Sequence, residues 1–278
     1  MILVTGATGT VGRAVLTELV ERGVGVRAVT RDPGAAGLPT GVEVVAADLT
    51  DPASLTPHLD GVEAVFLVWP SADPAVTAAT VPTLVKLLAD RVPRIVYLSA
   101  QAVESGAGSA WAIVEEAVET SGAVWTILRP TGFAANTLMW ADQIRSGDVV
   151  RWPYGEAARS LVHERDLAEV AVLALTRDGH GGARYVLTGP ATSTQREQVE
   201  AIGRAIGREL SWTELPRPAA LTILTEALSD PVYALAVLDG WAGFAARPET
   251  VTDTVREITG RPARSYAEWA VDHRDRFR

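Results

Sequence analysis

A glycine-rich segment near the start of the chain constrains its fold more than any other feature. The run Thr5–Gly12 has Gly-x-x-Gly-x-x-Gly spacing, follows an apolar strand pattern and precedes a helical pattern. In such a unit the first glycine allows a tight turn, the second lets the backbone approach a diphosphate, and the third lets the helix pack closely on the sheet. The start of the helix offers free amides to the anion. We expect diphosphate contacts from Thr5, Gly6, Thr8, Gly9, Thr10, Val11 and Gly12.

Strand and helix patterns alternate through the first half of the chain, which is typical of a parallel sheet with crossover helices. The strand patterns are mostly continuous apolar runs, as expected when helices cover both faces of a sheet. We predict an α/β fold with a doubly wound parallel sheet of the Rossmann type and a smaller C-terminal substrate lobe. The predicted strands are 2–5, 26–30, 42–46, 64–68, 94–98, 125–128, 184–187 and 210–215, and the predicted helices are 10–22, 52–59, 74–91, 108–121, one from Asp166, 195–206 and those within 219–277.

The end of the second predicted strand decides which dinucleotide fits. An acidic side chain there would bind both ribose hydroxyls of NAD, whereas this chain has Arg31 followed by Asp32. The Arg31 guanidinium can pair with a 2′-phosphate and stack on adenine, which favours NADP (NADPH) over NAD. Arg13 is a candidate for a second cationic contact. Asp32 either accepts hydrogen bonds from the ribose hydroxyls or begins the turn at Pro33.

The character of the sequence changes after Pro130, where aromatic residues become frequent. Six of the eight tryptophans lie from Trp125 onward. Buried tryptophan in a helical lobe explains this pattern, and a cleft for an apolar or aromatic ligand is the alternative. We expect an NAD(P)-binding Rossmann domain at 1–153, plus about 184–190, and a substrate-binding lobe at about 154–183 and 191–278.

Composition excludes several classes of function. The 278 residues include 34 acidic and 25 basic side chains, and a net charge of −9 argues against nucleic-acid binding driven by charge. Without cysteine, a disulfide, Cys-ligated zinc or a thiol nucleophile is excluded. The four histidines lack metal-ligand spacing, so we predict no metal. Because no signal-peptide pattern or membrane-length apolar run occurs, we expect a cytoplasmic monomer or homodimer that acts on a small molecule.

Further short motifs follow the predicted strands and helices in order. They are Thr-Gly-Ala-Thr-Gly-x-x-Gly at 5–12, Thr-Arg-Asp-Pro at 30–33, Ala-Asp-Leu-Thr-Asp at 47–51, Ile-Leu-Arg-Pro at 127–130 with Phe133 and Asn136, Arg-Asp-Leu-Ala at 165–168 and Thr-Gly-Arg-Pro at 259–262. Together they resemble the NmrA-like branch of the atypical short-chain dehydrogenases/reductases. The resemblance is specific for fold and cofactor and uninformative about substrate.

This resemblance implies further cofactor contacts, which fits the rule that ligands of doubly wound sheets bind beyond the carboxyl ends of the strands. For three of these residues there is a structural alternative to a cofactor contact: Asp48 as a turn residue, and Trp69 and Phe133 as core residues. The implied contacts are Asp48 and Leu49 at the adenine, Val68, Trp69 and Pro70 after the fourth strand, Ser99 and Ala100 beside the nicotinamide ribose, and Pro130, Thr131 and Phe133 near the nicotinamide.

The usual catalytic pair of short-chain reductases is absent from the sequence. Those enzymes use Tyr-x-x-x-Lys on one helix, where the lysine lowers the pKa of the phenol. The only lysine is Lys86, and no tyrosine precedes it by four residues. In this chain the corresponding helix is the one predicted at 108–121, where the two positions of the pair are occupied by Trp111 and Glu115. We expect an NADPH-dependent oxidoreductase acting on a small carbonyl, quinone or conjugated substrate, with an NADP(H)-sensing regulator or a non-redox isomerase or cyclase as alternatives.

Four residues are candidates for a catalytic role, each with a structural alternative. Trp111 is placed to face a substrate or to pack in the core. Glu115 would act as an acid if burial raised its pKa, or it is a helix-surface glutamate. Gln101 is a candidate for orienting a carbonyl. His163 would be a proton donor poised near neutral pH, and a structural histidine is the alternative.

Overall fold

A computed structural model describes residues 1–105, 109–228 and 230–278. The chain forms two compact units. The limits of these units differ from the domain limits expected from the sequence. The expected limits stay a prediction of where separately folding domains begin and end. The first unit comprises Met1–Pro130, Glu164–Leu187 and Thr254–Arg261, and the second comprises Thr131–His163, Thr188–Asp253 and Pro262–Arg278.

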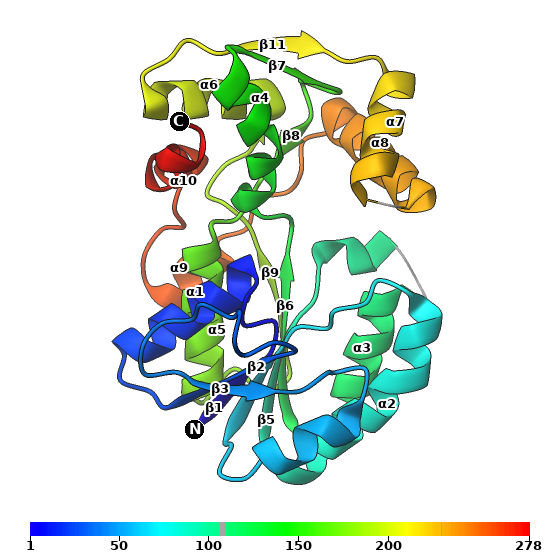
Figure 1. Cartoon of the computed structure of the whole chain (residues 1–278), viewed down its shortest axis with the longest axis vertical. Helices are drawn as coiled ribbons and strands as arrows, with labels where there is room; N and C mark the ends of the chain where they lie inside the picture. The colour runs from blue at the N-terminus through cyan, green and yellow to red at the C-terminus, as the bar shows by residue number, and fades with distance from the viewer. Residues whose placement is uncertain (106–108, 229) are drawn as a thin grey trace. The chain divides into compact units, whose positions relative to one another are not determined.

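A parallel sheet of seven strands, all within the described residues, forms the centre of the first unit (Figure 1). The strand order is β3-β2-β1-β4-β5-β6-β9, so the winding reverses between β1 and β4. In doubly wound sheets, ligands bind outside the carboxyl ends of the strands at such a reversal. The predicted doubly wound α/β fold is therefore confirmed. The strands are β1 (Ile2–Val4), β2 (Val26–Thr30), β3 (Glu43–Ala46), β4 (Ala64–Leu67), β5 (Arg94–Leu98), β6 (Val124–Pro130) and β9 (Ala183–Leu187).

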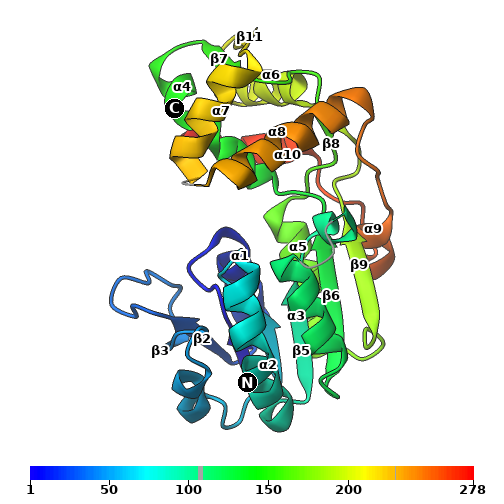
Figure 2. The same ribbon diagram turned by 90° about the vertical axis from the view of Figure 1, so that its right-hand side faces the viewer.

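Helices cover both faces of this sheet, which explains why its central strands are apolar throughout. Every residue of β1 and β4 is buried. Helices α1, α5 and α9 lie on one face, and α2 and α3 lie on the other (Figures 1 and 2). Their bounds, with those of two 3-10 helices, are α1 (Thr10–Glu21), η1 (Pro52–His58), α2 (Pro74–Arg91), η2 (Gln101–Ser105), α3 (Ala110–Glu119), α5 (Glu164–Thr176) and α9 (Thr254–Thr259).

Two helix predictions need correction. The helix predicted at 52–59 is the 3-10 helix η1, which contains Pro57, a residue that cannot donate a backbone hydrogen bond. Helix α5 begins at Glu164, so Asp166 lies in its first turn and is not its N-cap. Asp166 is fully buried, with Oδ1 3.1 Å from Nη1 of Arg261. Arg261 also pairs with Glu169, so the Thr-Gly-Arg-Pro motif joins the end of α9 to α5.

The second unit is built from short strands and helices around aromatic residues. Its core includes Trp140 and Trp269, both at most 1% exposed. Strand β7 pairs with β11 in parallel, and β8 pairs with β10 in antiparallel fashion. The elements are η3 (Ala134–Trp140), α4 (Ala141–Ser146), β7 (Val149–Trp152), β8 (Ala158–Arg159), β10 (Ser193–Thr194), α6 (Gln195–Ile206), β11 (Ser211–Glu214), α7 (Arg217–Leu228), α8 (Pro231–Ala246), α10 (Tyr266–Asp272) and η4 (Arg274–Arg276).

Membrane-spanning helices require a long apolar segment. Across the described residues, no helix combines sufficient length with sufficient hydropathy to cross a bilayer.

Candidate functional site

The turn from β1 into α1 requires glycine at Gly6 and Gly12. Gly6 adopts φ of +60°, which L-residues with side chains rarely adopt. A Cβ on Gly12 would lie 2.1 Å from the carbonyl oxygen of Gly6, whereas a Cβ on Gly9 would meet that oxygen at 3.3 Å. Thr5 Oγ1 accepts the backbone N–H of Val68 at 2.7 Å, which fastens the loop to the end of β4. The tight turn predicted at Gly6 is therefore present, and the atoms closest to a Cβ on Gly12 are backbone atoms of Gly6 and Ala7 in the loop; the predicted role of Gly12 in packing the helix on the sheet stays a prediction.

The start of α1 is suited to an anion. Gly9 is the N-cap residue and has no side chain to cap the helix. The backbone N–H of Arg13 donates to the carbonyl oxygen of Gly9 at 2.9 Å, so the amides of Thr10, Val11 and Gly12 precede the first bond of the helix. Such amides, together with the positive end of the helix dipole, bind phosphate groups.

A cavity of about 860 Å³ opens along this loop and the carboxyl ends of β1 to β4. Its volume is within the range of cofactor pockets. The bare backbone at Gly6 and Gly9 faces it, and so does Arg31. The residues therefore fit a nucleotide of the type predicted. The cavity is lined by Thr5, Gly6, Ala7, Thr8, Gly9, Val29, Thr30, Arg31, Asp32, Ala35, Ala36, Ala47, Asp48, Leu49, Thr50, Val68, Pro70, Ser71, Ala72 and Val76.

One oxygen of the Asp32 carboxylate is engaged in its own turn. Asp32 Oδ1 accepts the backbone N–H of Gly34 at 3.0 Å and that of Ala35 at 3.2 Å. This arrangement matches the turn-forming alternative from the sequence. Arg31 is exposed at the cavity edge. Arg13 donates to the carbonyl oxygen of Gly37 at 2.6 Å, so its guanidinium already holds the loop that follows β2.

Asp48 lines the cavity as predicted by the resemblance, and it also forms a turn. Its Oδ1 accepts the backbone N–H of Thr50 at 2.9 Å and the Thr50 hydroxyl at 2.8 Å. These hydrogen bonds hold the pKa of the Asp48 carboxyl below its usual value, and the positive charge of Arg31 acts in the same direction. Arg31 and Asp48 are thus within electrostatic reach of each other on the cavity wall.

Other predicted cofactor residues lie outside the lining of this cavity, among the residues that the structure describes. The indole N–H of Trp69 donates to Thr77 Oγ1 at 2.9 Å, and the ring packs against the core. Ser99 and Ala100 follow β5. Phe133 and Thr131 belong to the second unit. Their contact with a cofactor stays a prediction, as does that of Pro130 at the end of β6.

Glu115 is buried in a charged network, which differs from the helix-surface alternative. Its carboxylate receives two bonds from Arg129, from Nε at 3.0 Å and from Nη2 at 2.5 Å. The Ser99 hydroxyl donates a short hydrogen bond to the same carboxylate. Ser99 and Glu115 are 4% and 5% exposed. A paired carboxylate that already accepts three hydrogen bonds is poorly suited to donate a proton.

The remaining catalytic candidates lie on three separate segments of the chain. Trp111 is half-buried in the first turn of α3, and Gln101 is half-buried at the start of η2. His163 belongs to the second unit, where it is 1% exposed and its Nε2 lies 3.5 Å from Asp272 Oδ2. Burial beside a carboxylate favours the structural alternative for His163. The catalytic roles of all three residues stay predictions.

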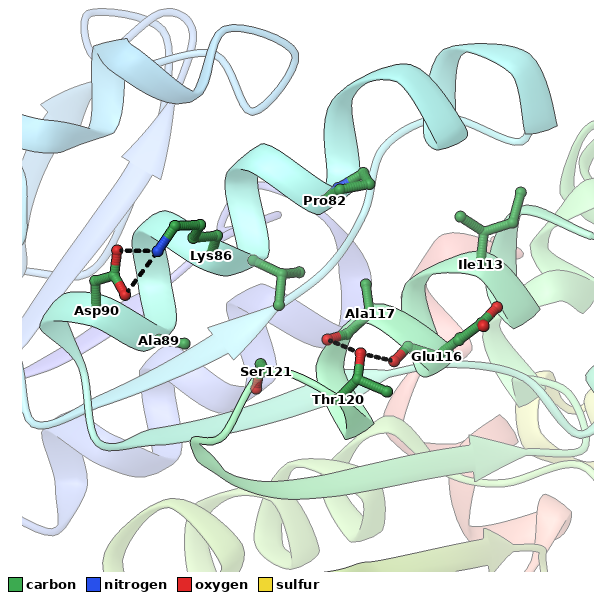
Figure 3. Close-up of a pocket in the computed structure, with 10 residues that line it drawn as sticks. Pro82, Lys86, Ala89, Asp90, Ile113, Glu116, Ala117, Thr120 and Ser121 are labelled. Carbon is green, nitrogen blue, oxygen red and sulfur yellow. Dashed lines mark hydrogen bonds and ion pairs between the residues drawn. The ribbon is translucent and has the colours of Figure 1, made fainter.

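A second cavity, of about 440 Å³, lies between α2 and α3 (Figure 3). It is lined by the C-terminal halves of these helices, and Lys86 there pairs with Asp90 at 2.9 Å. Because each crossover helix runs antiparallel to its strands, these halves lie toward the amino ends of the strands, opposite the ligand-binding edge. Lys86 has a side chain 75% exposed, which agrees with a solvated role.

The sequence reasoning missed several residues that line the nucleotide cavity. Ala35 and Ala36 lie in the turn after β2, Thr50 follows β3, and Ser71 and Ala72 follow β4. Of these residues, only Thr50 belongs to a quoted motif, Ala-Asp-Leu-Thr-Asp at 47–51. Their position immediately after predicted strand ends was the available signal, because ligand contacts in doubly wound sheets come from those loops.

Comparison with known proteins agrees with this geometry. The chain matches the NAD(P)H-binding family over residues 6–178, starting at the first glycine of the loop. It is 41% identical over 287 residues to a (4-alkanoyl-5-oxo-2,5-dihydrofuran-3-yl)methyl phosphate reductase of Streptomyces griseus subsp. griseus, covering 100% of this chain and 99% of that protein. It is 34% identical over 299 residues to an NAD(P)H azoreductase of Xenophilus azovorans, with coverage of 100% and 99%.

The fold also has close counterparts among solved structures. An NADPH-dependent quinone oxidoreductase from Escherichia coli, solved in complex with NADPH, has a TM-score of 0.81 and 24% identity, covering 98% of this chain and 99% of that chain. At this identity the likeness concerns the fold, and it agrees with the doubly wound sheet predicted from the sequence.

Proposed function

This chain belongs to the NAD(P)H-binding family, and from that premise we propose that it is an NADPH-dependent reductase of conjugated, electron-poor organic acceptors. In the coarser sense it is an NAD(P)H-dependent oxidoreductase, because the relatives that align over its whole length are named as reductases. The proposal adds a preference between nucleotides, a class of acceptor and a source for the proton.

The preference for NADPH rests on the end of β2. NAD-specific proteins place a free carboxylate at this point to bind the ribose hydroxyls. Here Asp32, which follows Arg31 in the chain, accepts from the backbone N–H groups of Gly34 and Ala35 in its own turn. The exposed guanidinium of Arg31 lies at the same edge of the cavity and suits a 2′-phosphate.

The observation that carries the acceptor class is the pairing of Glu115 with Arg129. In the helix where short-chain reductases have their Tyr-Lys pair, this chain has Trp111 and Glu115. Trp111 has no acidic proton in the neutral range, and Glu115 is held by a guanidinium at 2.5 Å. A reduction without a strong acid requires an acceptor whose negative charge is stabilised by its own conjugation.

The names of the two relatives describe acceptors of this kind. One acts on a dihydrofuranone whose ring double bond is conjugated to carbonyl groups, and the other acts on an azo group. In both, a polarised multiple bond can take up a hydride and spread the resulting charge over neighbouring atoms. We therefore assign to this chain a substrate with a conjugated C=C or N=N bond, or a quinone.

The overall step balances as one hydride and one proton added across the multiple bond. NADPH held at the nucleotide cavity would supply the hydride and would be released as NADP⁺. The chain binds the diphosphate at the Thr5–Gly12 loop and fixes the adenine half along β1 to β4. The proton reaches the conjugated anion from water after hydride transfer, because the buried Glu115 carboxylate cannot supply it.

A panel of acceptors tests this proposal. The purified protein is mixed with NADPH and with a quinone, an azo dye, an alkanoyl dihydrofuranone phosphate or a saturated ketone, and loss of reduced nicotinamide absorbance is followed. We expect at least one conjugated acceptor to be reduced and the saturated ketone to be inert. With NADPH deuterated at the transferred position, the label should appear at carbon in the dihydrofuranone product.

Two outcomes would overturn the proposal. Equal reduction of the saturated ketone would show that a proton donor exists, contrary to the arrangement of Glu115. Tight NADPH binding without reduction of any acceptor would favour a nucleotide-responsive regulator instead.

A further inference from the structure

Ser99 ends a chain of buried hydrogen bonds that leads through Glu115 to Arg129. The three side chains come from separate elements: Ser99 directly follows β5, Glu115 lies on α3, and Arg129 lies on β6. The Ser99 hydroxyl donates to Glu115, and Arg129 binds both carboxylate oxygens. The backbone N–H of Ser99 donates to the carbonyl oxygen of Leu128 at 2.8 Å, which fixes the backbone as well.

The network determines the hydrogen-bonding character of the serine. A hydroxyl has one proton and two lone pairs. The proton of Ser99 is directed to the Glu115 carboxylate, which is the stronger acceptor because it is charged. With its proton committed to Glu115, the Ser99 oxygen can only accept further hydrogen bonds.

The position of Ser99 in the sheet places it next to the nucleotide cavity. Leu67, the last residue of β4, pairs with Tyr97 of β5, so Ser99 follows its strand at the same edge of the sheet as the cavity residues Val68 and Pro70, which follow β4. The cavity covers the ends of β1 to β4, and a dinucleotide extends across the reversal between β1 and β4. With the adenine half on the side of β1 to β3, the nicotinamide half would extend toward the end of β5.

We infer that Glu115, clamped by Arg129, is a positioning residue that keeps Ser99 as a hydrogen-bond acceptor for a donor group on the nicotinamide half of NADPH, either a ribose hydroxyl or the carboxamide N–H. This inference rests on the proposed use of NADPH. It also gives the buried ion pair a role. In short-chain reductases the lysine four residues after the tyrosine lowers the pKa of the phenol, whereas here Glu115, four residues after Trp111, orients Ser99 for a cofactor contact.

A thermodynamic cycle on nucleotide affinity tests the inference without any organic acceptor. The dissociation constant of NADPH is measured by calorimetry for the wild type, Ser99→Ala, Glu115→Gln and the double variant. Each single variant should bind NADPH about tenfold more weakly, the effect of one lost hydrogen bond to a ligand. The double variant should bind no more weakly than Ser99→Ala, because Glu115 acts through Ser99. Glu116→Gln, which changes the exposed neighbouring glutamate, should bind as the wild type does.

Two further measurements separate positioning from structure. Ser99→Thr keeps the hydroxyl, so it should bind NADPH nearly as tightly as the wild type and more tightly than Ser99→Ala. This comparison tests the hydroxyl contact even if Glu115→Gln does not fold. Glu115→Gln should raise the KM for NADPH and leave the KM of the acceptor unchanged. If Glu115→Gln weakens binding by the same factor with Ser99 present or absent, or if neither single variant changes the dissociation constant, the inference is wrong. Because the cycle needs no turnover, it still holds if no acceptor is reduced, which is the separate failure of the proposed function.

Discussion

Arg129 binds the carboxylate of Glu115 through two nitrogens, with Nε 3.0 Å from Oε1 and Nη2 2.5 Å from Oε2. The pair joins β6 to α3 inside the first unit, where the Glu115 side chain is 6% exposed and that of Arg129 16%. A buried ion pair is costly to break from one side, because the partner left behind keeps its charge without compensation. The pair therefore matters both for the fold of this region and for the chemistry that the region supports.

Removing one partner should destabilise the protein more than replacing both. We expect Arg129→Ala to lower the free energy of unfolding by about 3 kcal/mol, whereas Arg129→Met with Glu115→Leu should lose much less, because no buried charge remains. Chemical denaturation of both variants measures the difference. An Arg129→Ala variant as stable as the wild type would show that the pair is not desolvated in solution.

The glycine loop should separate folding from nucleotide binding. Gly12→Ala brings a methyl group against the carbonyl oxygen of Gly6 at 2.1 Å, so we expect a loss of stability of about 1–3 kcal/mol from overpacking. Gly9→Ala meets the same oxygen at 3.3 Å, so its stability should fall less while NADPH affinity is lost. Thermal unfolding and nucleotide titration test this order, and unchanged NADPH binding by Gly9→Ala would contradict the assignment of the diphosphate.

Trp111 tests whether the start of α3 faces the substrate. Trp111→Phe keeps an aromatic ring and removes the indole N–H, so NADPH binding should stay unchanged while the rate of acceptor reduction changes. Steady-state kinetics with a quinone provides the measurement. Unchanged kinetics would place Trp111 in the core, where its half-buried ring then has a packing role only.

Asp48 should give the protein a measurable stability difference in acid. Hydrogen bonds from Thr50 lower the pKa of the Asp48 carboxyl in the folded state, so its contribution is present above the unfolded pKa and is lost as the pH falls through the folded pKa. Below about pH 4 the wild type should therefore lose stability relative to Asp48→Asn, by a few tenths of a kcal/mol because the group is largely solvated. Denaturation at neutral and acidic pH measures it, and a difference that does not depend on pH would contradict the assignment.

Much of the fold could be predicted because local pattern and tertiary structure agree. The predominantly apolar runs at 26–30, 64–68 and 94–98 became β2, β4 and β5 within a residue of their expected bounds, since burial on both faces selects apolar residues in such strands. Helix α5 begins two residues earlier than predicted, and the Asp166 carboxylate pairs with Arg261, a partner 95 residues away that local sequence rules cannot identify. Strands β8 and β10 of the second unit, with two residues each, are too short for a periodic signal.

The site divides in the same way. The glycine loop and Arg31 could be predicted because their chemistry depends on spacing next to a strand, which the sequence displays. The burial of Glu115 could not, because its neighbours Glu116 and Glu119 suggest an exposed helix face, and Arg129 lies on another element. The turn at Asp32 was one of two open alternatives, and only the geometry distinguishes them.

Calorimetric titration of the purified protein with NADPH and NADH tests the central claim most directly. We predict heat of binding for both nucleotides, with NADPH bound more tightly. In Arg31→Ala the advantage of NADPH should fall by about 1–3 kcal/mol, while NADH binding stays nearly unchanged. Equal losses for the two nucleotides would reject the contact between Arg31 and a 2′-phosphate, and no heat from either nucleotide with the wild-type protein would contradict the account as a whole.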